Sequence, residues 1–396
     1  MTRRTARSFL LGACLSLGLI AQVPAGNGAQ LWLLVLDGRG GPVGDLKPDE
    51  VELKVGGKVR PLAELKSPDQ LAAATQSWIL LFEPIRDPSY RAIAFTAAAD
   101  FLTKVPEGDQ VFIVARGKDS LESLLPGLST DRAAWAKALA RVPTMLPESL
   151  TGVPTGKLEG LGFQPFPKLA PPQPGGQEAL TALLARFKTG TIAWAGGTPD
   201  QKGRTAQDRV NLNDSAMVSG LVQAVGREMK TVEALLDSLA SVPGQKHMIV
   251  FSHCESDDLN QPSIRTSMNR KWSNQRVNGD MGGPAETATL AVRDITIQQM
   301  QLKAKSVQAG VMIYSVAGSS PNIIGNMGPL APDTGGFCFP LRSELESQLG
   351  QAMQVFGSRY LLRWAPLGTP TPTASIEVSV KRKGARVIAP TLTAAP

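Results

Sequence analysis

Short continuous apolar runs alternate with segments of helical period through the middle of this chain. Such runs are expected for strands buried on both faces of a sheet, and they cover Ser77–Phe82, Val111–Ala115, Met248–Phe251, Val311–Val316 and Gly336–Phe339. Between them the apolar positions predict helices over Pro88–Val105, Thr130–Ala140, Gln177–Lys188, Asp214–Leu239, a segment that ends near Ala309, and Ser343–Phe356. This alternation predicts a doubly wound α/β fold, with a parallel sheet covered on both faces.

The two ends of the chain predict β-structure only. Strand-like segments are Gln30–Leu36, Val51–Val55 and Lys58–Leu65 at the start, and Tyr360–Trp364, Ser375–Val380 and Ala385–Ala389 at the end. Neither set has enough strands to bury a face alone. We therefore expect both ends to pair in one small β-sandwich, into which the α/β domain is inserted.

Two polar or Pro/Gly-rich stretches, at about residues 143–176 and 255–286, lack sustained periodicity and are expected to be loop-like insertions. The expected division is a signal peptide at 1–25, the first part of the β-sandwich at 26–75, the α/β domain with both insertions at 76–357, and the second part of the β-sandwich at 358–396.

The N-terminus has the pattern of a secretory signal. An apolar stretch, Phe9–Val23, is too short for a stable membrane span and ends at small residues that suit cleavage after Ala25, or after Ala29; it follows three basic residues, Arg3, Arg4 and Arg7. We expect an exported protein (periplasmic, secreted or at the cell surface) without a transmembrane span in its mature chain. The alternative is a lipoprotein anchored at Cys14. A twin-arginine signal is disfavoured, because Ala6 stands where a bulky apolar residue is expected.

Charge gives no sign of a nucleic-acid partner. The net charge of +7 falls to +4 without the three arginines of the leader, which is too weak and scattered for a nucleic-acid interface. The one basic cluster lies at an expected hairpin turn, so we expect it to be solvated: Lys381, Arg382, Lys383 and Arg386.

Several segments, in the same order, resemble the von Willebrand factor A-related proteins common in Acidobacteria. The opening LWLLVLDGRGGPVGDLKPDEVELKVGGKVRPL is similar to the start of that family, and later matches are VPGQKHMIVFS, AGVMIYSV, LAPDTGGFCF, SRYLLRWAPLGTP and SIEVSVKRKGARV. The resemblance implies a Rossmann-like von Willebrand factor A domain, in which ligands bind at the carboxyl ends of the strands.

The same resemblance implies a metal-ion-dependent adhesion site, but most of its positions are degenerate here. Mg²⁺ prefers oxygen ligands. The Asp-x-Ser-x-Ser motif is replaced by Glu83-Pro84-Ile85-Arg86-Asp87, and His253 stands where an Asp is expected, with Thr198 as a possible threonine ligand. We therefore expect no cofactor and no bound Mg²⁺.

Catalytic motifs are missing from the sequence. There is no Gly-x-Ser-x-Gly elbow, Walker loop or Gly-x-Gly-x-x-Gly after a strand. His247 and His253 flank one strand, so they cannot share a metal, and Ser252 cannot pair with His253 because strand neighbours point to opposite faces. We expect no enzyme; the alternative is a hydrolase that uses the carboxylates of Glu83, Asp87 and Asp257.

The expected function is an exported protein–protein interaction module for adhesion or envelope assembly. We expect its unidentified protein partner to bind at the crest, the carboxyl edge of the central sheet, which holds Glu83, Arg86, Asp87, Ser252, His253 and Glu255. In the family's strand order another strand separates Cys254 from Cys338, so both are expected to be free, buried thiols rather than a disulfide.

Overall fold

The computed structural model describes residues 29–71, 74–83, 85, 88–116, 121–145, 176–188, 229–230, 232–252, 298–317, 330–365 and 374–393. The expected signal peptide, nearly all of the first insertion and the whole of the second lie outside these ranges. None of the described helices is long and apolar enough to cross a membrane.

A six-stranded sheet forms the centre of the molecule. Its strands are β5 (Gln76–Phe82), β6 (Gln110–Arg116), β7 (Leu121–Ser123), β8 (Gln245–Ser252), β9 (Val311–Ala317) and β10 (Cys338–Pro340). The order is β10-β9-β8-β5-β6-β7, and every neighbouring pair is parallel except β6 and β7. The chain thus winds outward from β5 in one direction and from β8 in the other. The expected doubly wound α/β fold is confirmed, and the antiparallel β7 makes the sheet mixed.

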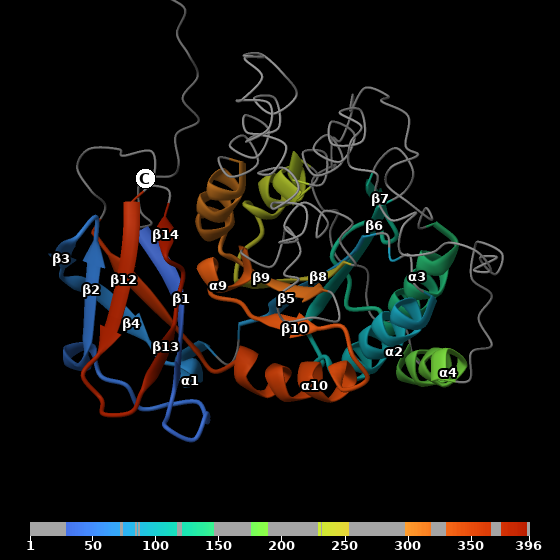
Figure 1. Ribbon diagram of the computed structural model, residues 1–396, viewed down its shortest axis with the longest axis horizontal. Coiled ribbons are helices and arrows are strands. Elements are labelled where there is room, and N and C mark those ends of the chain that lie inside the picture. The colour runs from blue at the N-terminus through green and yellow to red at the C-terminus, as the bar shows by residue number, and fades with distance from the viewer. Residues whose placement is uncertain are drawn as a thin grey trace, which may run out of the picture.

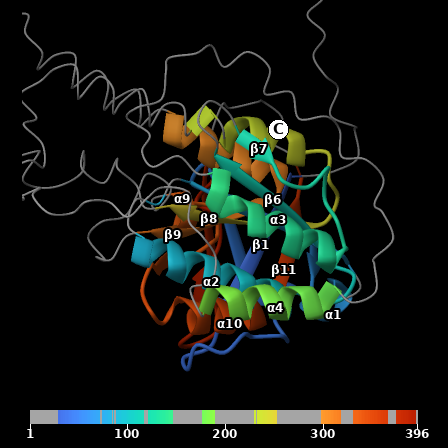
Figure 2. The ribbon, with the colours of Figure 1, turned by 90° about the vertical axis from the view of Figure 1, so that its right-hand side faces the viewer.

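Helices cover both faces of this sheet (Figures 1 and 2). On one face lie α2 (Pro88–Lys104), α4 (Gly176–Lys188) and α10 (Leu345–Phe356), with α3 (Arg132–Met145) beside them. On the other lie the helical residues 232–239 and 298–309. Asp131 caps α3, because its carboxylate accepts hydrogen bonds from the backbone amides of Ala133 and Ala134.

Two further four-stranded sheets contain the strands from both ends of the chain. One has the order β13-β1-β11-β4 and the other β14-β12-β2-β3. Their strands are β1 (Ala29–Leu36), β2 (Val51–Val55), β3 (Lys58–Arg60), β4 (Leu62–Lys66), β11 (Arg359–Trp364), β12 (Ala374–Val380), β13 (Arg386–Ile388) and β14 (Leu392–Thr393). In these sheets β1 pairs with β11 and β2 with β12, both antiparallel.

One apolar cluster joins the two outer sheets. It contains alternate residues of β1, β2, β11 and β12, among them Leu33, Leu53 and Leu362, which are fully buried. The other face of β1 turns toward the α/β part, where Trp32 belongs to the main core. The sheet that contains β1 therefore packs against a different core on each of its two faces.

The expected single strand Lys58–Leu65 is wrong. It divides at Pro61 into β3, which pairs with β2, and β4, which pairs with β11 in the other sheet. Proline has no N–H to donate, so a ladder is readily interrupted there. The sequence also failed to indicate β7, β14 and three short helical turns: η1 (Pro48–Glu50), α1 (Pro68–Leu71) and α9 (Leu330–Asp333).

The expected basic hairpin is wrong, because β12 and β13 belong to different sheets and do not pair with each other. The basic segment that connects them is also not simply solvated. The guanidinium of Arg382 pairs with the carboxylates of Asp45, at 2.5 Å, and Glu50, at 2.8 Å. These contacts tie the connection between β12 and β13 to the segment that precedes β2.

Candidate functional site

The candidate site is the crest, where β5 and β8 lie side by side and the winding direction reverses. Glu83 follows β5 directly, and its backbone N–H donates to the carbonyl oxygen of Phe251 on β8 at 2.9 Å. Ser252 is the last residue of β8 and is buried. Open α/β sheets bind ligands at such a reversal point, so the structure brings Glu83 and Ser252 to the edge expected for them.

The carboxylate of Glu83 is held by Arg116, a residue that the sequence analysis did not single out. The guanidinium Nη2 donates to Oε1 at 3.0 Å and Nε donates to Oε2, so the pair is bidentate. Glu83 is 2% exposed and Arg116 is 6% exposed. Arg116 ends β6, the strand beside β5, and Phe82 pairs with Ala115 in register. The basic residue at the end of the run VFIVAR was the signal that could have identified it.

The described crest does not fit a Mg²⁺ ion. Glu83 already contacts a cation, and Ile85 has no oxygen to offer and is buried in the main core. Within the described ranges, no group of three or more His, Cys, Asp or Glu side chains is arranged to hold a metal. Five of the predicted site residues lie outside those ranges: Arg86, Asp87, Thr198, His253 and Glu255.

His247 lies near the amino end of β8 and is fully buried. Its Nδ1 is 3.0 Å from the hydroxyl of Tyr314 and its Nε2 is 3.0 Å from Oε1 of Gln76, while its ring stacks on Trp78 at 4.2 Å. Burial, together with the nearby charge of Arg359, lowers the pKa of His247 well below its usual value. It is a neutral core residue with both ring nitrogens engaged, and it has no access to a substrate.

The side chain of Cys338 is exposed, rather than buried as expected. It lies on β10, a three-residue strand at the edge of the sheet, where only one side is covered by a neighbouring strand. Cys254 lies outside the described residues. As expected, one strand, β9, separates β8 from β10.

No protein-family model and no curated protein sequence matches this chain. Solved structures with a similar fold include a von Willebrand factor type A protein from Catenulispora acidiphila, with 9% identity, a TM-score of 0.33, and coverage of 93% of this chain and 74% of that one. The ArnB paralog VWA2 from Sulfolobus acidocaldarius has 9% identity, a TM-score of 0.29, and coverage of 92% and 76%. The SpRpn10 VWA domain has 10% identity, a TM-score of 0.28, and coverage of 71% and 96%. Likenesses this distant assign neither a family nor a function.

Proposed function

We propose that this chain is an exported protein–protein interaction module of von Willebrand factor A type, which binds its partner at the crest without a metal. The proposal includes the architecture: the two outer sheets form one β-sandwich that holds the α/β domain as an insertion. Its support comes from the strand order of the central sheet, the position of the crest at the reversal point, and the ion pair at that point.

The Glu83–Arg116 pair is the observation that supports partner binding without a metal ion. To bind Mg²⁺, Glu83 would have to give up the two hydrogen bonds that the buried Arg116 donates to it. Removing one partner of a buried ion pair costs about 3–5 kcal/mol. Mg²⁺ also keeps near-octahedral oxygen coordination and loses its water reluctantly, so a single carboxylate beside Ile85 offers it little.

The partner-binding role falls to the residues that follow the strand ends. Arg86 and Asp87 follow β5 within a few residues, and His253 and Glu255 follow β8. Loops placed on a rigid sheet commonly carry binding functions. Since Arg116 already donates to Glu83, Arg86 is the residue proposed to donate two hydrogen bonds to a carboxylate of the partner.

The hydrolase alternative is not favoured. It needs a carboxylate that is free to take or give a proton, and a general base must reach that proton within hydrogen-bond distance. Both oxygens of Glu83 accept hydrogen bonds from Arg116, and the side chain is buried, which removes one of the three carboxylates on which the alternative rests.

Adding metal ions tests the proposal that the crest binds no metal. Millimolar Mg²⁺ or Mn²⁺ should leave the melting temperature of the mature chain unchanged. A ligand at about 100 times its Kd would add about 2.7 kcal/mol, which corresponds to several degrees. A metal-dependent rise that disappears in Glu83→Ala would contradict the proposal.

Site-specific crosslinking tests the crest itself. A photoreactive amino acid replaces Arg86 or Glu255 in the mature chain, and the matched control replaces Val59, which is 63% exposed on the edge strand β3. In an envelope extract, the crest positions should form a discrete crosslinked product that the Val59 position does not form. The product should persist in EDTA and weaken in Arg86→Ala.

Two results would count against the crest. One is the same product from the Val59 position. The other is loss of the product on deletion within residues 146–175 while deletion within residues 256–286 leaves it intact.

A further inference from the structure

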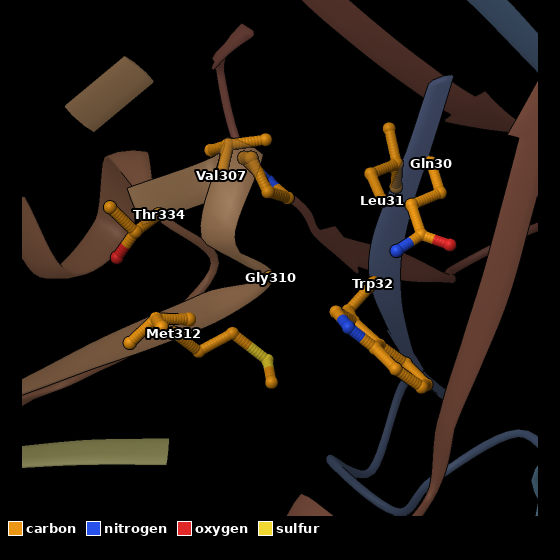
Figure 3. A pocket seen from close by; sticks show the side chains of 9 residues that line it. Gln30, Leu31, Trp32, Val307, Gly310, Met312 and Thr334 are labelled. Carbon is orange, nitrogen blue, oxygen red and sulfur yellow. The ribbon is translucent and has the colours of Figure 1, made fainter. Parts of the chain in front are cut away.

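A small pocket lies at the opposite end of the central sheet, between β1 and the amino end of β9 (Figure 3). Its walls include Trp32 from β1, Val307 and Gly310 from the segment before β9, Met312 from β9, and Thr334. Its free space of about 10 Å³ is enough for about one water molecule. The pocket therefore sits at the junction of the two cores, far along the strands from the crest.

The indole N–H of Trp32 is aimed into this pocket without an acceptor. Trp32 is 7% exposed, and its Nε1 has no hydrogen-bond partner. The nitrogen lies on the side of the ring that faces Gly310 (Figure 3). Leaving a buried donor unsatisfied costs about 1–3 kcal/mol. None of the described residues supplies an acceptor for this N–H group.

A buried ammonium group lies beside the same pocket. Lys246, the second residue of β8, is 4% exposed. Its Nζ donates to the carbonyl oxygens of Ala309 at 2.7 Å and Gly244 at 3.4 Å. No ion pair with a described carboxylate is present. An ammonium group has three N–H donors, so one remains available. The pKa of Lys246 is lowered to about 8 by burial alone, which is the effect of an uncompensated cation.

Gly310 leaves open the point where these two donors converge. A Cβ on Gly310 would lie 3.5 Å from Nζ of Lys246 and 3.8 Å from Nε1 of Trp32. Gly310 also has a φ of +67°, which disfavours any other residue. The absent side chain therefore keeps open a space that is close to both nitrogens.

The surrounding charges favour a negative occupant. Arg359 is fully buried, with Nε and Nη1 unpartnered, and its Nη2 bonds only neutral groups: the hydroxyl of Tyr314 and the carbonyl of Gly335. Leu34 pairs with Arg359 and Trp32 with Leu361. Arg359 therefore lies diagonally across from Trp32 on the neighbouring strand, with roughly 7–8 Å between their Cα atoms. Asp333, next to Thr334, is already paired with Lys303.

We propose that this pocket is a site for a compact monovalent anion, a halide or a carboxylate no larger than formate, held by the indole N–H of Trp32 and the ammonium of Lys246. The anion supplies the acceptor that Trp32 lacks and the counter-charge that Lys246 lacks. It bridges a strand of the outer sheets to a strand of the central sheet. The proposal is independent of the crest.

An NMR titration tests this site directly. The chain contains six tryptophans, so the indole N–H resonances of ¹⁵N-labelled mature protein are few, and Trp32→Phe identifies the one that belongs to Trp32. Sodium chloride and sodium formate are titrated separately. We expect one or both to shift the Trp32 resonance to saturation and to raise the melting temperature by a few degrees. The arm that saturates first distinguishes a halide from a carboxylate.

Matched glycine variants separate binding from general salt effects. Gly310→Ala places a methyl group at the convergence point and should abolish the saturable shift. Gly56→Ala carries a similar backbone strain, with a φ of +60°, but has nothing within 4 Å, and it should bind like the wild type. A wild-type Trp32 resonance that fails to saturate with either salt overturns the proposal, whether or not Gly310→Ala folds. A saturable shift that persists in folded Gly310→Ala overturns it as well.

Discussion

At the scale of single residues, the Glu83–Arg116 pair decides what the crest can do. Both side chains are buried, and Arg116 donates a hydrogen bond to each carboxylate oxygen of Glu83. Replacing both partners of such a pair by apolar groups is often neutral or stabilising, whereas removing one leaves an uncompensated charge. The pair therefore adds little net stability, but the loss of either partner alone lowers the free energy of unfolding strongly.

We predict that Arg116→Met lowers the free energy of unfolding by about 3–5 kcal/mol and that Glu83→Met/Arg116→Met restores most of it. Urea unfolding at neutral pH measures both. The control is Lys54→Met, which removes a half-exposed pair with Glu52 and should change stability by less than about 1 kcal/mol. Equal losses in the single and double variants would show that the charge of Glu83 is not the reason.

His247 predicts a loss of stability in mild acid. Its pKa is lowered in the folded chain, so below about pH 6.5 the unfolded chain binds a proton that the folded chain does not. The free energy of unfolding should then fall by up to about 1.4 kcal/mol per pH unit. Comparing urea unfolding of the wild type and His247→Gln between pH 7 and 5.5 isolates this effect. Identical slopes in the two proteins would refute it.

At the scale of elements, apolar periodicity predicted the long strands and helices well. Strands β5, β6, β8 and β9 are buried on both faces, so their sequences are continuous apolar runs, which the sequence analysis predicted as strands. Apolar periodicity could not predict the division at Pro61 or the short strand β7, because each depends on pairing with another strand. Arg116 was missed for the same reason: its role follows from the register of β6 against β5.

Gly336 shows a close approach between elements that the sequence did not reveal. A Cβ at this position would lie 1.8 Å from the carbonyl oxygen of Ile313 on β9. We predict that Gly336→Ala destabilises the protein by about 1–3 kcal/mol or more, because the backbone before β10 must move. Gly44→Ala is the control, since nothing lies within 4 Å of its added methyl group. Thermal melting compares them, and equal melting temperatures would disprove the expected clash.

At the scale of the whole molecule, the strands from both ends of the chain depend on one another. The pairing of β1 with β11 and of β2 with β12 follows the expectation that neither set stands alone. The sequence indicated this from strand number only. It could not indicate that β1 also closes the α/β core through Trp32, since that requires knowing which face of β1 turns toward which core.

Truncation after Gly357 should make the protein aggregate. It removes β11 and β13, the two partners of β1, and β12, a partner of β2, which leaves unpaired apolar edges. Truncation after Thr393 is the control, because all described strands remain. Size-exclusion chromatography and thermal melting report the outcome. A monomeric chain with an unchanged melting transition after the longer truncation would mean that the two ends do not form one unit.

The long sequence distance between paired strands has a consequence during synthesis. Asp45 and Arg382, which pair in the folded protein, are 337 residues apart. At about 5–20 residues per second, their separation corresponds to roughly 17–67 s of translation. Over that interval β1, with its run of Leu and Val, has been made but has no strand to pair with. High contact order slows folding and prolongs the exposure of apolar strands. In the nascent chain the first strand therefore stays unpaired until the last strands have been made.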